Sequence, residues 1–202
     1  MSRFKIVLDP GHGGLDGGAV LPGARRESDS NLEAALHAAI MLRDAGHDVL
    51  LTREDDRYVS LAERARLAND WGADLFLSLH ADWAPGGNPK PHGHHCVRSI
   101  VAKSGQGGDR LAHLLVYALT EATHMAAFAR SGGPVWSERH PVFRWADRLA
   151  VIRWTTMPAV LVERGFMSNP DDCALLFDEE HLRQQAGGIV LAVDRYFEMV
   201  RS

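Results

Sequence analysis

The chain has 202 residues, of which 46% are hydrophobic, and 22 lysines and arginines stand against 26 aspartates and glutamates, for a formal net charge of -4. A chain of this length buries about 70% of the surface that its unfolded form exposes, and no Pro/Gly/Ser-rich linker divides it, so we expect one domain over residues 1–202. The absence of a basic stripe argues against a nucleic-acid partner. The chain also contains no run of about 18–20 apolar residues, the length needed to span a membrane.

The first half of the chain alternates segments typical of strands and of helices. Apolar runs predict strands, apolar residues at three- and four-residue spacing predict helices, and two Ser-x-x-Glu patterns resemble capping boxes at helix starts. In chain order, the predicted elements are a strand in the segment 4–11, a glycine-rich loop at 11–18, a helix from Ser30 to Gly46, a strand at 48–52, a helix from Ser60 to Gly72 and a strand at 74–79.

The second half is less regular but ends in the same alternation. Its predicted elements are a Pro/Gly loop at 83–91, a strand at 95–102, an amphipathic helix at 109–125, an irregular segment at 126–148, a short extended piece at 149–153, a strand at 158–162 and a final helix at 179–200. The repeated strand–helix order predicts the α/β class, with a mostly parallel central sheet flanked by helices in a single domain.

Three residues that can bind a metal or transfer a proton follow predicted core strands. They are His12, His80 and Glu163. Because the carboxyl ends of the strands in a mostly parallel sheet form one edge, where ligands bind, we expect these residues to converge. A catalytic zinc takes three histidine or carboxylate ligands and leaves one position open, and a further carboxylate then moves the proton of the attacking water. With Glu27 as the third candidate ligand and Glu163 as the further carboxylate, these residues predict a metal-dependent hydrolase.

Two other kinds of site are not favoured. The glycine-rich loop lacks the G-x-x-x-x-G-K-[S/T] pattern and does not match G-x-G-x-x-G, so we do not expect a nucleotide site. The two cysteines, Cys96 and Cys173, form no CxxC pair, and unpaired cysteine is most often a small buried hydrophobic residue.

An ordered series of short motifs makes the prediction more specific. The motifs are Asp9-Pro10-Gly11-His12-Gly13-Gly14, Gly18-Ala19, Glu27 ahead of Asn31-Leu32, Leu51-Thr52-Arg53, Ser60-Leu61 with Arg64, Ala68-Asn69, Ser78-Leu79-His80-Ala81, Met157-Pro158-Ala159-Val160-Leu161-Val162-Glu163 and Gly165-Phe166-Met167-Ser168-Asn169. In this series the chain resembles the amidase type 3 family, the zinc-dependent N-acetylmuramoyl-L-alanine amidases that cleave bacterial cell wall. The resemblance spans nearly the whole chain and is weakest across about residues 82–148.

The resemblance implies a set of roles. It implies that His12, Glu27 and His80 bind Zn2+ and that Glu163 is the catalytic glutamate. The implied fold is a single α/β domain with the zinc site at the carboxyl edge of the strands. The implied reaction is hydrolysis of the amide between N-acetylmuramic acid and L-alanine of the stem peptide, which makes peptidoglycan the expected partner.

Two positions depart from the family pattern. Family members often carry lysine after the glutamate ligand, where this chain has Ser28, and asparagine two residues after the second histidine ligand, where it has Asp82. Neither position is a ligand, so we expect metal binding to be retained. Asp82 is a candidate for altered substrate contacts or metal tuning.

Four further polar residues have alternative readings. His92, His94 and His95 form a loop cluster that we expect to face solvent, with a second metal site or an approach to the substrate groove as alternatives. Asp9 is a candidate for accepting a hydrogen bond from a ligand histidine, although an Asp-Pro turn explains it equally well.

Two functional alternatives remain open at this point. The first is a non-catalytic peptidoglycan-binding or regulatory module on the same fold, and the second is a zinc peptidase or amidase with another substrate. No apolar signal segment precedes the first strand. We therefore expect a protein that acts on the cell wall either as a phage-type lysin made in the host cytoplasm or as a trimmed exported enzyme. We also expect it to be a monomer.

Overall fold

The computed structural model describes residues 3–23, 25–98, 107–127 and 149–201. The strands are β1 (Lys5–Pro10), β2 (Asp48–Leu51), β3 (Leu75–Asp82), β4 (His95–Arg98) and β5 (Ala159–Phe166). The helices are α1 (Glu27–Asp44), α2 (Leu61–Trp71), the 3-10 turn η1 (Pro85–Gly87), α3 (Gly107–Thr123), α5 (Ala150–Arg153), α6 (Pro170–Leu176) and α7 (Glu179–Arg201).

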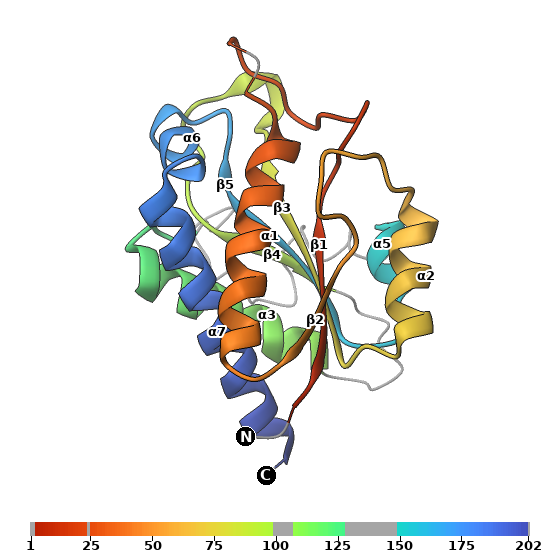
Figure 1. The fold of residues 1–202 in the computed structure, drawn as a ribbon. Coiled ribbons are helices and arrows are strands. Elements are labelled where there is room, and N and C mark those ends of the chain that lie inside the picture. The colour runs from red at the N-terminus through yellow and green to blue at the C-terminus, as the bar shows by residue number, and fades with distance from the viewer. Residues whose placement is uncertain (1–2, 24, 99–106, 128–148, 202) are drawn as a thin grey trace.

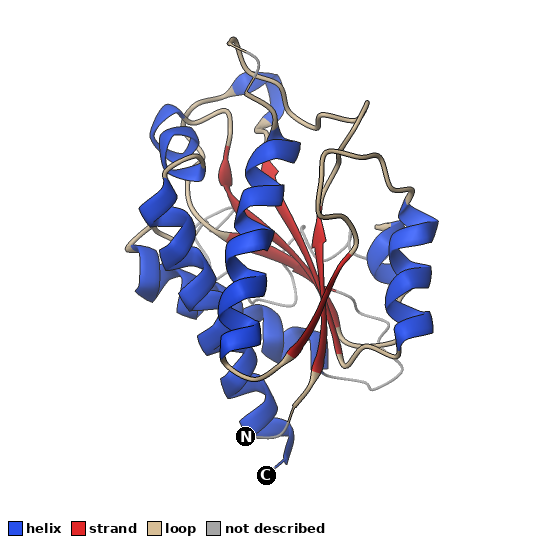
Figure 2. Cartoon of the chain, viewed as in Figure 1, coloured by secondary structure: helices blue, strands red, loops and turns tan. Residues whose placement is uncertain are grey.

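The strands form one five-stranded sheet in the order β2-β1-β3-β5-β4. The pairs β1–β2, β1–β3 and β3–β5 are parallel, and only the edge strand β4 runs antiparallel, against β5. Helices cover both faces, with α1 and α7 on one side and α2 and α5 on the other (Figures 1 and 2). The prediction of a mostly parallel α/β sheet flanked by helices is confirmed.

The strands alternate their side chains between two apolar layers. Ile6, Leu8 and Val162 pack into the layer formed with α1, α3 and α7. Val7 and Leu161 point the other way, into a smaller layer that includes residues of α2 and α5. Because the central strands are buried on both faces, they have nearly continuous apolar sequences. These runs hold the carboxyl ends of β1, β3 and β5 at the edge of the sheet opposite the chain termini (Figure 1).

The first predicted capping box is wrong and the second is confirmed. Helix α1 begins at Glu27, so Ser30 lies inside the helix, where its buried hydroxyl donates to the backbone oxygen of Leu176 at 2.7 Å. A tertiary contact therefore explains this serine. Ser60, by contrast, caps α2 by accepting from the backbone N–H of Glu63 at 3.2 Å.

The structure also differs from the prediction around β5. The piece at 149–153, predicted to be extended, contains the short helix α5. Helix α6 was not predicted, although Asn169 caps it by accepting from two backbone N–H groups, and proline occupies its first turn. The predicted strand at 95–102 is confirmed over β4, and its remainder lies outside the described residues, as does most of the irregular segment at 126–148.

Among the helices in the described ranges, none combines the length and the apolar character needed to cross a bilayer.

Candidate metal centre

The fold brings the predicted site residues to one edge of the sheet. His12 lies two residues beyond the end of β1, His80 lies in β3 and Glu163 lies in β5, and these three strands are neighbours in the order β1-β3-β5. Glu27 is the first residue of α1, which begins above the same edge. The convergence expected from the strand ends is therefore present.

Three of these side chains form a compact donor set. The Nε2 atom of His12 lies 3.2 Å from Oε1 of Glu27, and the Nδ1 atom of His80 lies 3.0 Å from the same oxygen. One donor atom from each residue lies within 4.8 Å of the other two. A tetrahedral zinc with bonds of 2.0–2.1 Å places its donors roughly 3.3 Å apart, so two nitrogens and one carboxylate oxygen at these spacings fit zinc.

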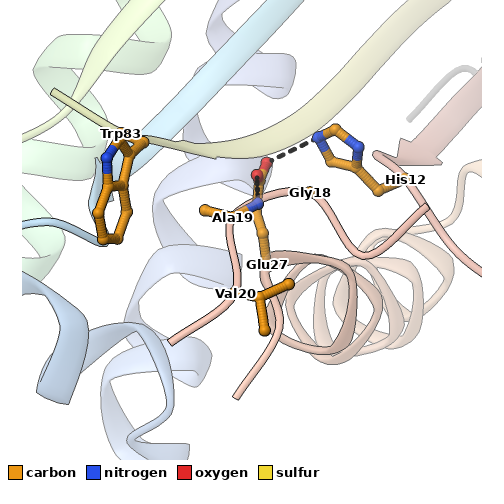
Figure 3. Close-up of a pocket in the computed structure, with 6 residues that line it drawn as sticks. All are labelled: His12, Gly18, Ala19, Val20, Glu27 and Trp83. Atoms are coloured by element: carbon orange, nitrogen blue, oxygen red, sulfur yellow. Dashed lines mark hydrogen bonds and ion pairs between the residues drawn. The ribbon is translucent and has the colours of Figure 1, made fainter. Parts of the chain in front are cut away.

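Backbone and side-chain donors fix the carboxylate of Glu27. Its Oε1 atom accepts from the backbone N–H of Ala81 at 3.1 Å and from Nδ2 of Asn31 at 3.2 Å, and its Oε2 atom accepts from the backbone N–H of Ala19 at 3.0 Å. Figure 3 shows the carboxylate held between the loop at Gly18 and Ala19 and the ring of His12. The carboxylate of Glu27 is therefore held in one orientation by the protein alone.

The charges of the donor set favour an ionised carboxylate. Burial alone would raise the pKa of Glu27, but hydrogen bonds with His12 and His80 and their positive charge outweigh it and hold the pKa far below its usual range. A carboxylate whose ionised form is favoured in this way is available as a metal ligand.

Asp16 fixes the orientation of the first histidine. Its Oδ1 atom lies 2.9 Å from Nδ1 of His12, which leaves Nε2 directed toward Glu27. Burial alone would lower the pKa of His12, but the contacts with Glu27 and Asp16 outweigh it and raise the pKa to about 9. A carboxylate on the outer nitrogen of a ligand histidine is the usual second partner at a zinc site. The sequence analysis did not identify Asp16 in this role.

Asp9, the residue proposed for such a role, does something else. Its carboxylate accepts from Thr52 Oγ1 at 2.6 Å, from Ser78 Oγ at 2.7 Å and from Arg64 Nη1 at 2.7 Å, all in a buried setting. It therefore links the end of β1 to its neighbours, and the reading of Asp9 as a histidine partner is wrong.

The backbone that carries His12 is tightly held. His12 has a left-handed φ of 60°, which non-glycine residues rarely adopt outside sites where the surroundings enforce it. Arg64 donates to the backbone oxygen of His12 at 2.7 Å, and Arg53 donates to that of Gly11 at 3.0 Å. A Cβ atom at Gly11 would lie 2.2 Å from Cε1 of His80, so only glycine fits beneath that ring.

Glu163 lies beside the donor set and is not part of it. It is paired with His80 in the register of β3 and β5. Its Oε2 atom is buried and has no hydrogen-bond partner among the described residues. Burial, together with the negative charges of Asp82 and Glu27, raises the pKa of Glu163 well above its usual value. Its environment therefore favours the protonated form of this carboxyl group more than water does.

Two cavities adjoin His12. The first, of about 300 Å³, is lined by His12, Gly18, Ala19, Val20, Glu27 and Trp83 (Figure 3). The second, of about 280 Å³, is lined by Asp9, Gly11, His12, Asp16, Tyr58, Val59, Leu61, Arg64, His80 and Val151. The donor set is thus open to a ligand from two sides.

The histidine cluster does not act as a unit. His92 is exposed, as expected, but His94 is fully buried and its Nε2 atom lies 2.9 Å from a threonine hydroxyl at the end of α3. The solvent-facing reading is therefore wrong for His94. The side chains of His95 and Cys96 lie outside the described part, and Cys173 is a free, buried cysteine whose thiol pKa burial raises.

Comparison with known proteins assigns the family. Residues 6–195 match the sequence profile of Amidase_3, described as N-acetylmuramoyl-L-alanine amidase, and the chain belongs to this family. It is 28% identical over 220 residues to the N-acetylmuramoyl-L-alanine amidase AmiA of Escherichia coli, over 95% of this chain and 75% of that protein.

Solved structures agree with this assignment. An N-acetylmuramoyl-L-alanine amidase from Clostridium difficile 630 superimposes with a TM-score of 0.82 at 30% identity, over 97% of each chain. The catalytic domain of CwlV, an N-acetylmuramoyl-L-alanine amidase from Bacillus (Paenibacillus) polymyxa var. colistinus, superimposes with a TM-score of 0.78 at 29% identity, over 97% of this chain and 99% of that domain.

Proposed function

We propose that this protein is a zinc-dependent amidase that hydrolyses the bond between N-acetylmuramic acid and L-alanine in peptidoglycan, with residues 1–202 acting as one catalytic domain. The observation that carries the proposal is the His12–Glu27–His80 donor set, whose atoms have the spacing and chemistry of a three-ligand zinc site. Family membership narrows the reaction to amide hydrolysis in the cell wall.

The proposal gives each residue a defined task. His12, Glu27 and His80 would hold the metal, and the atoms that face one another are Nε2 of His12, Nδ1 of His80 and Oε1 of Glu27. A zinc ion bound there supplies Lewis acidity, which activates water and polarises the amide carbonyl. Glu163 takes the proton released as water attacks and transfers it to the amide nitrogen, so that the amine departs neutral and the carboxylate is regenerated.

The surroundings of Glu163 suit a residue that cycles between two protonation states. A carboxyl group with an ordinary pKa is a weak base and takes a proton from the attacking water slowly at neutral pH. Burial and neighbouring negative charge raise the pKa of Glu163, and a pKa closer to the working pH favours both the acceptance and the return of the proton.

The two cavities at His12 give a branched substrate room on both sides of the scissile amide. One contains the half-exposed indole of Trp83 and the other the exposed ring of Tyr58. Peptidoglycan has a glycan arm and a peptide arm that meet at this bond, and aromatic faces with one wet edge suit such amphipathic ligands.

The two alternatives predict different behaviour. A non-catalytic wall-binding module on this fold does not need a glutamate with a buried carboxyl oxygen and a raised pKa beside an intact donor set, so these features of Glu163 favour turnover. A zinc peptidase with another substrate would leave the amide of the muramoyl group intact. We further propose that the enzyme acts on the cell wall as a monomer, which gel filtration would check directly.

The experiment that tests metal dependence uses purified peptidoglycan. The zinc-loaded protein is expected to clear a suspension of peptidoglycan, to lose this activity in EDTA and to regain it when zinc is restored. His80→Ala is expected to lose both zinc and activity, whereas His92→Ala, which alters an exposed histidine, serves as the matched control. Full clearing by the metal-free protein would overturn the proposal.

A further inference from the structure

Arg164 is a buried cation whose hydrogen-bond partners are neutral. It is fully buried in β5. Its guanidinium donates to Oε1 of Gln185 at 3.0 Å, to Oγ of Ser30 at 2.7 Å and to Oδ1 of Asn31 at 2.9 Å. Within the described ranges it makes no ion pair. Burying a charge without an ion pair is costly, so the position of this residue calls for a physical reason.

The position of Arg164 connects it to the donor set from behind. Neighbouring residues of a strand point to opposite faces of the sheet, so Arg164 lies on the side of α1 and α7, and Glu163 lies on the other side. Arg164 reaches Asn31 in α1, one helical turn after the ligand Glu27. Asn31 in turn donates through Nδ2 to Oε1 of Glu27 at 3.2 Å and, at 3.4 Å, to the backbone oxygen of Gly11.

The chemistry of these groups fixes the direction of the contacts. A guanidinium only donates hydrogen bonds, so the carboxamide of Asn31 must turn its oxygen toward Arg164. Its NH2 group is then directed toward Glu27, which as an ionised carboxylate only accepts. The cation strengthens this orientation, because a carboxamide turned the other way would direct its NH2 group at the guanidinium and its oxygen at the carboxylate, and both contacts are repulsive.

We propose that Arg164 is a positioning residue for the metal ligand Glu27, acting through the carboxamide of Asn31. The inference rests on the proposed metal centre and adds to it a residue that touches neither metal nor substrate. The buried charge holds Asn31 in the one orientation that supports Oε1 of Glu27, the oxygen shared by the contacts to both histidines. Partners of this kind at zinc sites typically change metal affinity by about 10–100-fold.

A purely structural role for Arg164 makes a different prediction. Its bonds to Ser30 and Gln185 tie α1 to α7 and contribute to stability without touching Asn31. If Arg164 only stabilised the fold, removing its bonds to Ser30 or Gln185 would change zinc affinity in the same way as removing the arginine itself. Ser30→Ala and Gln185→Met therefore serve as matched controls, since each removes one bond to Arg164 and leaves the contact with Asn31.

The test measures zinc affinity by competition with a chromophoric chelator, on full-length protein stripped of metal and shown to be folded by circular dichroism. Arg164→Met is expected to bind zinc about 10–100-fold more weakly than the wild type. Arg164→Lys, which keeps a donor-only cation, is expected to restore most of the affinity. Ser30→Ala and Gln185→Met are expected to bind zinc as the wild type does.

Further variants keep the test decisive. If Arg164→Met does not fold, Arg164→Gln replaces the cation with a neutral amide of similar polarity and is expected to weaken zinc binding as well. If neither variant folds, Asn31→Leu is the test, because the proposed effect of Arg164 on Glu27 passes through Asn31. Wild-type zinc affinity in Asn31→Leu overturns the proposal. In folded variants, combining Arg164→Met with Asn31→Leu should weaken binding no more than Asn31→Leu alone.

Two results would contradict the proposal directly. One is wild-type zinc affinity in folded Arg164→Met and Arg164→Gln, and the other is an equal loss of affinity in Ser30→Ala or Gln185→Met. A wild-type protein that binds no zinc would instead overturn the metal centre itself. The failure of this inference is thereby distinguished from the failure of the proposed function.

Discussion

His80 and Glu163 occupy paired positions in the register of the adjacent parallel strands β3 and β5. The hydrogen-bond ladder of the sheet therefore fixes the proposed metal ligand and the proposed proton carrier relative to one another. Functional groups that regular elements support in this way are held more accurately than groups on loops. Because His80 is assigned to the metal and Glu163 to the proton, changing Glu163 should affect turnover and not metal binding.

Glu163→Gln is expected to abolish turnover while zinc remains bound. The amide of glutamine has nearly the same shape as the carboxyl group but cannot take the proton of the attacking water. The donor set does not include Glu163, so metal affinity should stay at its wild-type value. Hydrolysis rates on peptidoglycan and a parallel zinc titration measure the two effects.

The control for this substitution is Glu180→Gln, which alters an exposed carboxylate in the first turn of α7. It should change neither rate nor metal content. Wild-type turnover in Glu163→Gln would remove this residue from the mechanism, and loss of zinc would show that it acts as a ligand.

Asp16→Ala is expected to weaken zinc binding by about 10–100-fold, because it removes the carboxylate that holds Nδ1 of His12. With the ring free to rotate, Nε2 no longer faces Glu27 in a single orientation. Asp55→Ala, which removes a more exposed carboxylate on a neighbouring loop, is the control. Equal zinc affinities in the two variants would show that Asp16 does not orient the ligand.

Gly11→Ala is expected to lose metal affinity and activity together. The added Cβ atom would lie 2.2 Å from Cε1 of His80, so the ring has to move away from the donor set. Gly187→Ala in α7 is the control, because its Cβ atom would meet only the end of Met41 at 3.7 Å and alanine favours a helix. Zinc titration of both variants measures the difference, and normal binding by Gly11→Ala would contradict this packing.

The site residues that lie at the ends of buried strands were predictable from the sequence. The apolar runs before His12, His80 and Glu163 identify core strands, and parallel strand ends converge for general reasons. Glu27 begins a helix after a long loop, so its position depends on how that loop folds, and it was identified by its spacing from His12 together with the family resemblance. Asp16 was missed because its contact with His12 is made inside an irregular loop that no periodic pattern describes.

The two Ser-x-x-Glu patterns show which parts of the fold a local sequence pattern can predict. The Ser-x-x-Glu pattern at Ser60 caps a helix as predicted, whereas the same pattern at Ser30 lies inside α1 because its serine bonds across the protein to α6. A local pattern does not reveal a partner 146 residues away. The class of the fold followed from periodicity, but the start of α1, on which the placement of Glu27 depends, followed from tertiary contacts.

His181 is expected to make stability depend on pH. Burial, and then the positive charge of Arg164, lowers the pKa of His181 below its ordinary value of 6.5. The unfolded chain therefore binds a proton below about pH 6.5 that the folded protein does not, and stability falls as the pH is lowered from there, with a slope of up to about 1.4 kcal/mol per pH unit.

Chemical denaturation of the wild type and of His181→Gln between pH 7.5 and pH 5 measures this effect. The free energy of unfolding of the wild type should decrease more steeply than that of the variant over this range, because the variant lacks the titrating ring. Parallel curves for the two proteins would show that His181 does not contribute.

The central claim, that the protein cleaves the muramoyl–alanine amide, is tested most directly by mass spectrometry of the products released from purified peptidoglycan by zinc-loaded protein, with an EDTA-treated sample beside it. We expect stem peptides with a free L-alanine amino terminus and glycan strands that retain the lactyl group, both dependent on metal. Peptides cut at another amide, or sugars with new reducing ends, would contradict the claim.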